Sequence, residues 1–288
     1  MSFGIAGAAA WADHSRIDVS ASHATALTAS HRGGRGSPMV LLHGFTGSWR
    51  VWALMLAQLE RHHDVFAPTL PGHAGGPPIG DRVTTDEVLD AVERMLDEAG
   101  VGSAHLVGNS LGGYIALRLA QRGRAESVVA LAPAGGWVAG DPALAQTLAL
   151  FPEWQAAFRA LAPHADAITR TPEGRRRATA ALTVHYEHLA PELVVAIMNA
   201  TAFCPGTQPL IDTALREGYE LDPERITCPV RVVWGTADAL LPWPSSAVRY
   251  RQEWLPHADW VELDSVGHCP QLDVPLEAAQ LILGFTAR

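Results

Sequence analysis

The 288-residue sequence contains no lysine, so all 21 of its basic side chains are arginines. Its acidic side chains number 30, which gives a formal net charge of −9 with neutral histidines. A nucleic-acid partner requires a basic surface to meet its phosphates, and no basic stripe runs through this sequence. The short run Arg175–Arg177 is interpreted as a solvated helix face, with a phosphate site as the alternative. We therefore expect no nucleic-acid partner.

Cysteine and long apolar runs are also scarce. An odd count of three cysteines with irregular spacing predicts no disulfide framework and fits a reducing compartment. No apolar run approaches the ~20 residues that span a bilayer. The apolar start, Phe3–Ala12, has no basic segment before it, because the first arginine is Arg16, so no signal peptide is expected. These absences predict a cytoplasmic protein without a membrane span.

Histidine is plentiful, with 13 residues, and so raises the question of a metal site. The closest pairs are His62 with His63 and His185 with His188. Neither pair has a convincing third ligand nearby in the sequence, and a zinc site needs at least three protein ligands. We expect no bound metal.

Length and composition fit a globular protein, either one domain with an insertion or two modest domains. Hydrophobic residues make up 48% of the sequence and charged residues 18%. Short β-rich runs alternate with longer helical patterns, as in a parallel sheet covered by helices on both faces. The expected strands are 17–19, 25–30, 38–42, 65–67, 106–107, 127–131, 229–234 and 260–263, and the expected helices 49–61, 84–99, 111–121, 245–254 and 275–285.

The alternation stops in the middle of the chain. From about Gly136 to about Arg225 the pattern is helical, with no clear strand, and the strand signal then returns. We therefore predict an α/β core made of residues 1–135 and 226–288, interrupted by a helical cap at 136–225.

One serine lies between two glycines where an expected strand turns into an expected helix. In Gly108-Asn-Ser-Leu-Gly112, glycines on both sides of Ser110 allow a tight turn that exposes the hydroxyl. The start of the following helix places backbone N–H groups and the positive end of its dipole beside that hydroxyl. A turn built only for close packing is the alternative. In this context we predict that Ser110 is a nucleophile.

A nucleophilic serine needs a base, and the base needs an acid that orients it. Asp238 follows the strand 229–234, and His268 follows the strand 260–263. Both therefore lie at carboxyl ends of strands, where open α/β sheets bind ligands. Competing acids are Asp264, Asp273 and Asp141. We predict a triad of Ser110, Asp238 and His268.

The segment after strand 38–42 begins with His43-Gly44. A glycine here allows the backbone to approach a substrate, so the N–H of Phe45 can join the N–H of Leu111 in an oxyanion hole. We interpret His43 as a structural histidine that braces the loop. Gly44 is expected to contact the substrate.

These motifs resemble those of the α/β-hydrolase superfamily, over roughly residues 18–136 and 225–288. The matching features are His43-Gly44, Leu70-Pro-Gly-His73, Gly108-Asn-Ser-Leu-Gly-Gly113, Gly235-Thr-Ala-Asp238 and Gly267-His268. Members often carry Asp before the Leu-Pro-Gly turn and a glycine after its histidine, whereas this sequence has Thr69 and Ala74. The resemblance implies a mostly parallel sheet, a lid inserted between strands and no cofactor.

The resemblance indicates the substrate only broadly. Asn109 in the elbow resembles the carboxylesterases and the hydrolases of carbon–carbon bonds. Ser110 excludes the dehalogenase and epoxide hydrolase branches, which need an aspartate nucleophile. We expect a small hydrophobic ester, thioester or lactone, with Trp137 in an apolar wall. A carbon–carbon hydrolase, a lyase, a perhydrolase and a ligand receptor with a retained triad are alternatives. The oligomeric state stays open, a homodimer included.

Overall fold

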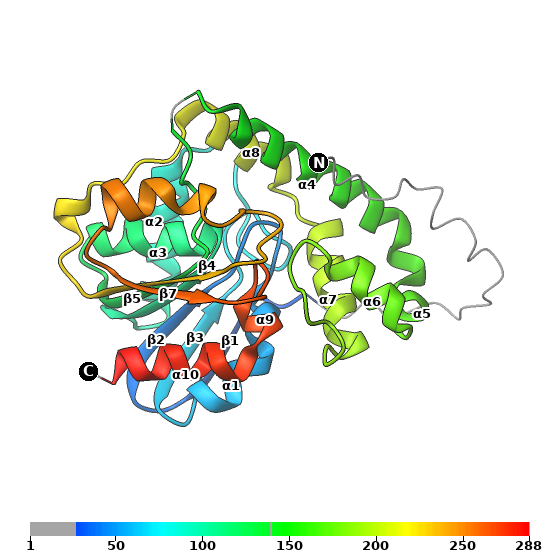
Figure 1. The fold of residues 1–288 in the computed structure, drawn as a ribbon, viewed down its shortest axis with the longest axis horizontal. Helices are drawn as coiled ribbons and strands as arrows, with labels where there is room; N and C mark the ends of the chain where they lie inside the picture. Colours follow the sequence, from blue (N-terminus) through cyan, green and yellow to red (C-terminus); the bar gives the residue numbers. More distant parts are fainter. Residues whose placement is uncertain (1–26, 139, 288) are drawn as a thin grey trace.

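The computed structural model describes residues 27–138 and 140–287, and a seven-stranded sheet forms the centre of this part of the chain (Figure 1). The strand order is β1-β3-β2-β4-β5-β6-β7. β1 runs antiparallel to β3, and every other neighbouring pair is parallel. The strands are β1 (Ser30–Gly34), β2 (Ser37–Leu42), β3 (His63–Pro68), β4 (Ala104–Asn109), β5 (Ala125–Leu131), β6 (Val230–Gly235) and β7 (Asp259–Leu263).

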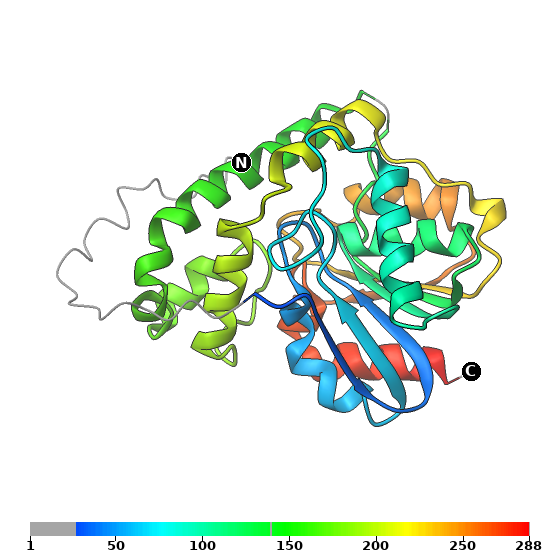
Figure 2. The ribbon, with the colours of Figure 1, turned by 180° about the vertical axis from the view of Figure 1, so that it is seen from behind.

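Helices cover both faces of this sheet, as the continuous apolar strands predict. In β2, Met39 and Leu41 pack into one core cluster, whereas Val40 and Leu42 pack into the other. Figures 1 and 2 show α2 and α3 on one face and α1 and α10 on the other. The covering helices are α1 (Ala53–Leu59), α2 (Thr85–Glu98), α3 (Leu111–Gln121) and α10 (Pro275–Thr286).

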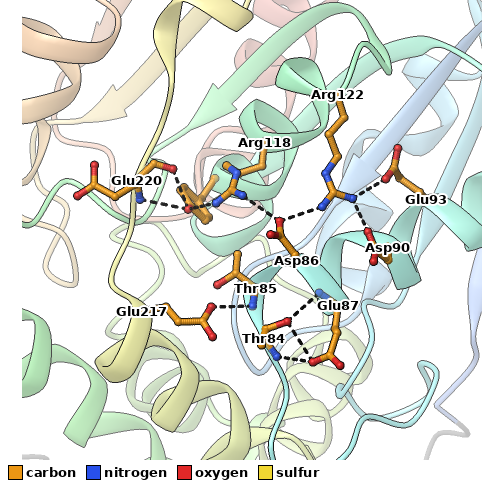
Figure 3. Close-up of polar contacts among 11 residues, drawn as sticks. Thr84, Thr85, Asp86, Glu87, Asp90, Glu93, Arg118, Arg122, Glu217 and Glu220 are labelled. Carbon is orange, nitrogen blue, oxygen red and sulfur yellow. Dashed lines mark hydrogen bonds and ion pairs between the residues drawn. The ribbon is translucent and has the colours of Figure 1, made fainter.

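Ion pairs and a capping box fix α2 beside α3 (Figure 3). The Thr84 hydroxyl accepts a hydrogen bond from the Glu87 N–H, and the Glu87 carboxylate accepts from the Thr84 N–H, which satisfies two donors that a helix start leaves free. Asp86 on α2 accepts hydrogen bonds from Arg118 on α3 and from Arg122, which directly follows α3. This face of the core is therefore held by polar contacts above its apolar packing.

All regular elements of the chain between β5 and β6 are helices. This insertion lies over one end of the core in both views (Figures 1 and 2). Glu217 at the end of this insertion accepts a hydrogen bond from the Thr85 N–H of α2. Its elements are α4 (Pro142–Leu161), η3 (Ala162–His164), α5 (Ala165–Thr169), α6 (Pro172–Thr179), α7 (Pro191–Ala202), α8 (Thr207–Glu217) and η4 (Pro223–Arg225).

No single helix in the described ranges is long and apolar enough to cross a membrane; α7 and α8 reach that length and apolarity only together, across a bend of 66°.

Several expected elements differ from those observed. The expected strand 17–19 lies outside the described residues, and in the described part of 25–30 only Ser30 is in a strand, because the edge strand β1 occupies Ser30–Gly34. The expected helix 49–61 starts with the 3₁₀ turn η2 (Trp49–Trp52).

The expected helix 245–254 is also irregular. It consists of the 3₁₀ turn η5 (Ser245–Ala247) and the π-helix η6 (Tyr250–Trp254). The N–H of Leu255 donates to the carbonyl of Tyr250, five residues earlier, which widens the last turn. A further short helix, α9 (Pro270–Asp273), follows His268.

Candidate active site

The turn from β4 into α3 holds Ser110 in a strained backbone conformation. Its φ of 55° and ψ of −120° lie outside the regions that side chains normally allow. A Cβ atom on Gly108 would lie 2.1 Å from the Gly112 carbonyl oxygen, and one on Gly112 would lie 2.0 Å from the Leu42 carbonyl oxygen. Both glycines are therefore required by close backbone approach, as the sequence pattern suggested.

Asp238 and His268 meet at the carboxyl ends of β6 and β7. The Nδ1 atom of His268 lies 2.7 Å from an Asp238 carboxylate oxygen, and both side chains are buried. The other Asp238 oxygen accepts hydrogen bonds from the N–H groups of Leu240, at 2.9 Å, and Leu241, at 2.7 Å. These amide donors hold the Asp238 carboxylate in place, and the carboxylate in turn orients the imidazole through Nδ1.

The Nε2 atom of His268 is buried and has no hydrogen-bond partner within the described structure. In the neutral tautomer that donates from Nδ1 to Asp238, Nε2 presents a lone pair. Ser110 and His268 line the same cavity, although no hydrogen bond joins them. An imidazole held in this way can accept a proton from a group that enters the cavity.

The three competing acids have other partners. Asp264 accepts a hydrogen bond from the Thr236 hydroxyl at 3.2 Å, and Asp141 caps the start of α4 through the Ala143 N–H. Among the described residues, the Asp273 carboxylate accepts hydrogen bonds only from backbone N–H groups. Asp238 is therefore the acid that contacts His268.

The segment after β2 is braced by His43, as expected. Its Nδ1 donates to the Gly44 carbonyl at 2.8 Å, while its Nε2 accepts from the Leu70 N–H at 2.9 Å. Burial, reinforced by nearby His73, holds the pKa of His43 well below its ordinary value, so the ring stays neutral. A Cβ atom on Gly44 would lie 3.2 Å from the Ser110 Cβ, so this position favours glycine.

The two N–H groups expected to form the oxyanion hole belong to Phe45 and Leu111. Phe45 follows the His43-Gly44 turn, and Leu111 is the first residue of α3. Neither N–H donates a hydrogen bond in the contacts of the described residues. Both residues line the same cavity as Ser110.

Asn109 has a role that the sequence pattern did not reveal. Its amide nitrogen donates to the carbonyls of Leu131, at 3.1 Å, and His268, at 3.0 Å. Its amide oxygen accepts from Gln271 at 2.9 Å and from the Cys269 thiol at 3.2 Å. Asn109 thus ties the elbow to the segment that carries His268. Burial raises the pKa of Cys269 well above its usual value, which disfavours the reactive thiolate.

Asp273 anchors the same segment to the helical insertion. Its buried carboxylate accepts hydrogen bonds from the Gly267 N–H at 2.5 Å and from the N–H groups of Val184 and His185. The Cys269 N–H also donates to the Leu182 carbonyl at 2.8 Å. Sequence reasoning missed this contact because its partners are backbone groups about 90 positions away.

Two cavities meet at Ser110. The inner chamber encloses about 70 Å³ and the outer chamber about 250 Å³. Trp137, expected in an apolar wall, lines the inner chamber, and Gly44, expected to contact substrate, lines the outer chamber. The residues shared by both are Phe45, Ser110, Phe151 and Leu240.

Comparison with known proteins establishes the family. Residues 37–275 match the family described as "alpha/beta hydrolase fold". The chain belongs to this family. The match spans both flanks of the insertion and confirms the resemblance that the motifs suggested.

Relatives within the family have different names. The chain is 34% identical over 199 residues to Epoxide hydrolase EphH of Mycobacterium tuberculosis, covering 69% of this chain and 92% of that protein. It is 31% identical over 272 residues to a pimeloyl-[acyl-carrier protein] methyl ester esterase of Aromatoleum aromaticum, covering 85% and 96%. The crystal structure of carboxylesterase CesB from Bacillus subtilis superposes with a TM-score of 0.68 at 20% identity, covering 94% and 92%. This family member is therefore a hydrolase with esterase-like and epoxide-hydrolase-like neighbours.

Within the described ranges, no three His, Cys, Asp or Glu side chains form a group that could hold a metal ion. The side chains of Asp238 and His268 hydrogen-bond to each other, and Asp238 also accepts from two backbone amides.

Proposed function

We propose that this family member is a serine hydrolase that cleaves a carboxylic ester, thioester or lactone of a small hydrophobic substrate. The observation that carries the proposal is the buried Asp238–His268 pair, whose unpartnered Nε2 lies in the wall of the cavity that also contains Ser110. We further propose that residues 136–225 act as a cap over this cavity.

The first half of the reaction forms an acyl-enzyme. The Ser110 oxygen bonds to the substrate carbonyl carbon while its proton passes to Nε2 of His268, and the N–H groups of Phe45 and Leu111 stabilise the negative oxygen. The bond to the leaving group then breaks, and His268 returns the proton to the departing oxygen or sulfur. Asp238 stabilises the imidazolium between these two transfers.

The second half restores the enzyme. Water loses a proton to His268 and bonds to the acyl carbon, and Ser110 leaves as its oxygen regains the proton. The free carboxylic acid is released. Proton exchange requires the Ser110 hydroxyl and Nε2 of His268 to come within hydrogen-bond distance.

The test combines labelling with turnover. We expect a fluorophosphonate to modify Ser110, identified by mass spectrometry, and p-nitrophenyl esters to be hydrolysed. Ser110→Ala should lose both, with at least about a 10³-fold fall in kcat/KM, while thermal unfolding stays cooperative. Undiminished ester hydrolysis by a folded Ser110→Ala protein would refute the proposal.

Epoxide hydrolysis is a second candidate because one relative, 34% identical over 69% of this chain, has the name Epoxide hydrolase EphH. The elbow of this chain carries a serine at position 110, which favours acyl transfer. Turnover of styrene oxide to its diol that survives Ser110→Ala, in the absence of ester hydrolysis, would favour the second candidate.

A further inference from the structure

The two cavities at Ser110 differ in the exposure of the residues that line them. Every residue that lines the inner chamber is buried or half-buried. The outer chamber, in contrast, includes the exposed residues Arg177, Ala180 and Ala239. The outer chamber therefore has the more exposed wall, and Ser110 lies where the two chambers meet.

The two proposed catalytic groups are divided between the chambers. His268 lines only the outer chamber, whereas Leu111 lines only the inner chamber, and Ser110 belongs to both. In the proposed reaction, His268 must return a proton to the leaving group. The leaving group therefore has to lie on the His268 side, and the acyl group extends in the other direction.

Size and polarity separate the two sides further. The inner chamber encloses about 70 Å³ and the described residues that line it include no Asp, Glu, Lys or Arg, while burial lowers the pKa of its one histidine, His73, to about 4. A charged group there would lose its hydration without a partner, which is costly. The outer chamber encloses about 250 Å³, and the exposed Arg177 is part of its wall.

From these observations we propose an orientation and a substrate class, which rest on the proposed function. The substrate is an ester or thioester of a short, uncharged, apolar acyl group on a larger alcohol or thiol. The acyl group occupies the inner chamber, and the leaving group occupies the outer chamber and extends past Arg177 toward solvent. Acyl length is therefore limited by the inner wall, and leaving-group size is not limited in the same way.

Two matched substitutions test this orientation. Ala214 on α8 lines only the inner chamber, and Ala157 on α4 lines only the outer chamber. Changing either to leucine adds the same isopropyl group to one chamber and leaves the other untouched. Thr147→Leu and Ala181→Leu, each in the wall of one chamber, form a second pair if either first variant fails to fold.

Two substrate series separate the chambers. The first holds p-nitrophenol constant and varies the acyl group from acetate to octanoate. The second holds butanoate constant and varies the alcohol from methyl to octyl, with acid release followed by pH-stat. Ala214→Leu should lower the kcat/KM ratio of hexanoate to acetate at least tenfold without changing the alcohol preference. Ala157→Leu should lower kcat/KM for the longer alcohols relative to methyl, without changing the acyl preference. A hemisuccinate ester, which puts a carboxylate in the acyl group, should react at least tenfold more slowly than the butanoate.

The opposite assignment, with Ala214→Leu acting on the alcohol series, would overturn the inference, as would equal effects of both variants on both series. These results presuppose ester turnover by the unmodified protein. If that protein neither turns over esters nor reacts with a fluorophosphonate at Ser110, the proposed function itself fails, so the two failures are distinguishable.

Discussion

Replacing Asn109 with alanine should weaken both the fold and the catalytic step. Four hydrogen bonds meet at this buried amide. In Asn109→Ala the Leu131 carbonyl still accepts from the Ser110 N–H at 2.9 Å. The His268 carbonyl and the Gln271 amide nitrogen, however, lose the partner that they have in the described structure.

The magnitude follows from those two groups. A buried polar group left without a partner costs about 1–3 kcal/mol, so the two together should lower the free energy of unfolding by about 4 kcal/mol. Domains of this kind are stable by about 5–15 kcal/mol, so Asn109→Ala should still fold at 25 °C. Because one orphaned group belongs to His268 itself, we also expect kcat for p-nitrophenyl butanoate to fall about tenfold or more.

Urea unfolding and steady-state kinetics measure the two effects on the same samples. Gln271→Ala serves as the matched control, because it removes one donor to Asn109 and leaves the His268 carbonyl bonded. It should cost about 1 kcal/mol and alter kcat much less. A loss of stability below about 1 kcal/mol in Asn109→Ala, or equal kcat values in the two variants, would refute the reasoning.

Three further changes test other parts of the structure. Gly112→Ala should destabilise the fold by more than about 3 kcal/mol in urea unfolding, because its Cβ would lie 2.0 Å from the Leu42 carbonyl oxygen; a near-wild-type midpoint would contradict this. Burial lowers the pKa of His73 to about 4, so the fold excludes a proton that the unfolded chain binds below about pH 6.5. The contribution of His73 to the free energy of unfolding should therefore be fully present above pH 6.5 and should fall by about 3 kcal/mol as the pH is lowered to 4. In His73→Asn, the free energy of unfolding should depend less steeply on pH between pH 7 and 4.5. An unchanged slope would count against the assignment. Asp273→Asn replaces two acceptor oxygens with one. It should lower the free energy of unfolding by about 2 kcal/mol and speed hydrogen exchange of the backbone N–H groups at 184, 185 and 267. Unaltered exchange at these positions would exclude the anchoring role.

The sequence predicts a site feature best where the spacing of nearby residues follows from a single local steric requirement. Gly108 and Gly112 lie two positions from Ser110 because backbone atoms leave no room for a Cβ there, and that spacing can be read without any partner. The ends of β6 and β7 likewise predicted that Asp238 and His268 come together, since parallel strands share an edge. The contact between the two side chains at 2.7 Å agrees with this expectation.

Other features depend on partners that no local pattern contains. β1 has the sequence Ser-His-Arg-Gly-Gly at the edge of the sheet, without the apolar alternation that indicates a strand. The bonds of Asn109 to His268 and Gln271 join positions about 160 apart. The division of the cavity at Ser110 depends on how α4 and α8 lie over the core, which periodicity does not specify.

The Asp273 carboxylate has a consequence for the exchange of parts between relatives. It accepts hydrogen bonds from the N–H of Gly267, next to His268, and from the N–H groups of Val184 and His185 in the insertion. A chimera that keeps this core and takes its insertion from another hydrolase must offer two backbone donors at the same place. Without them, a buried negative charge would lose part of its solvation beside the histidine, and a transplanted insertion could reduce turnover without touching substrate.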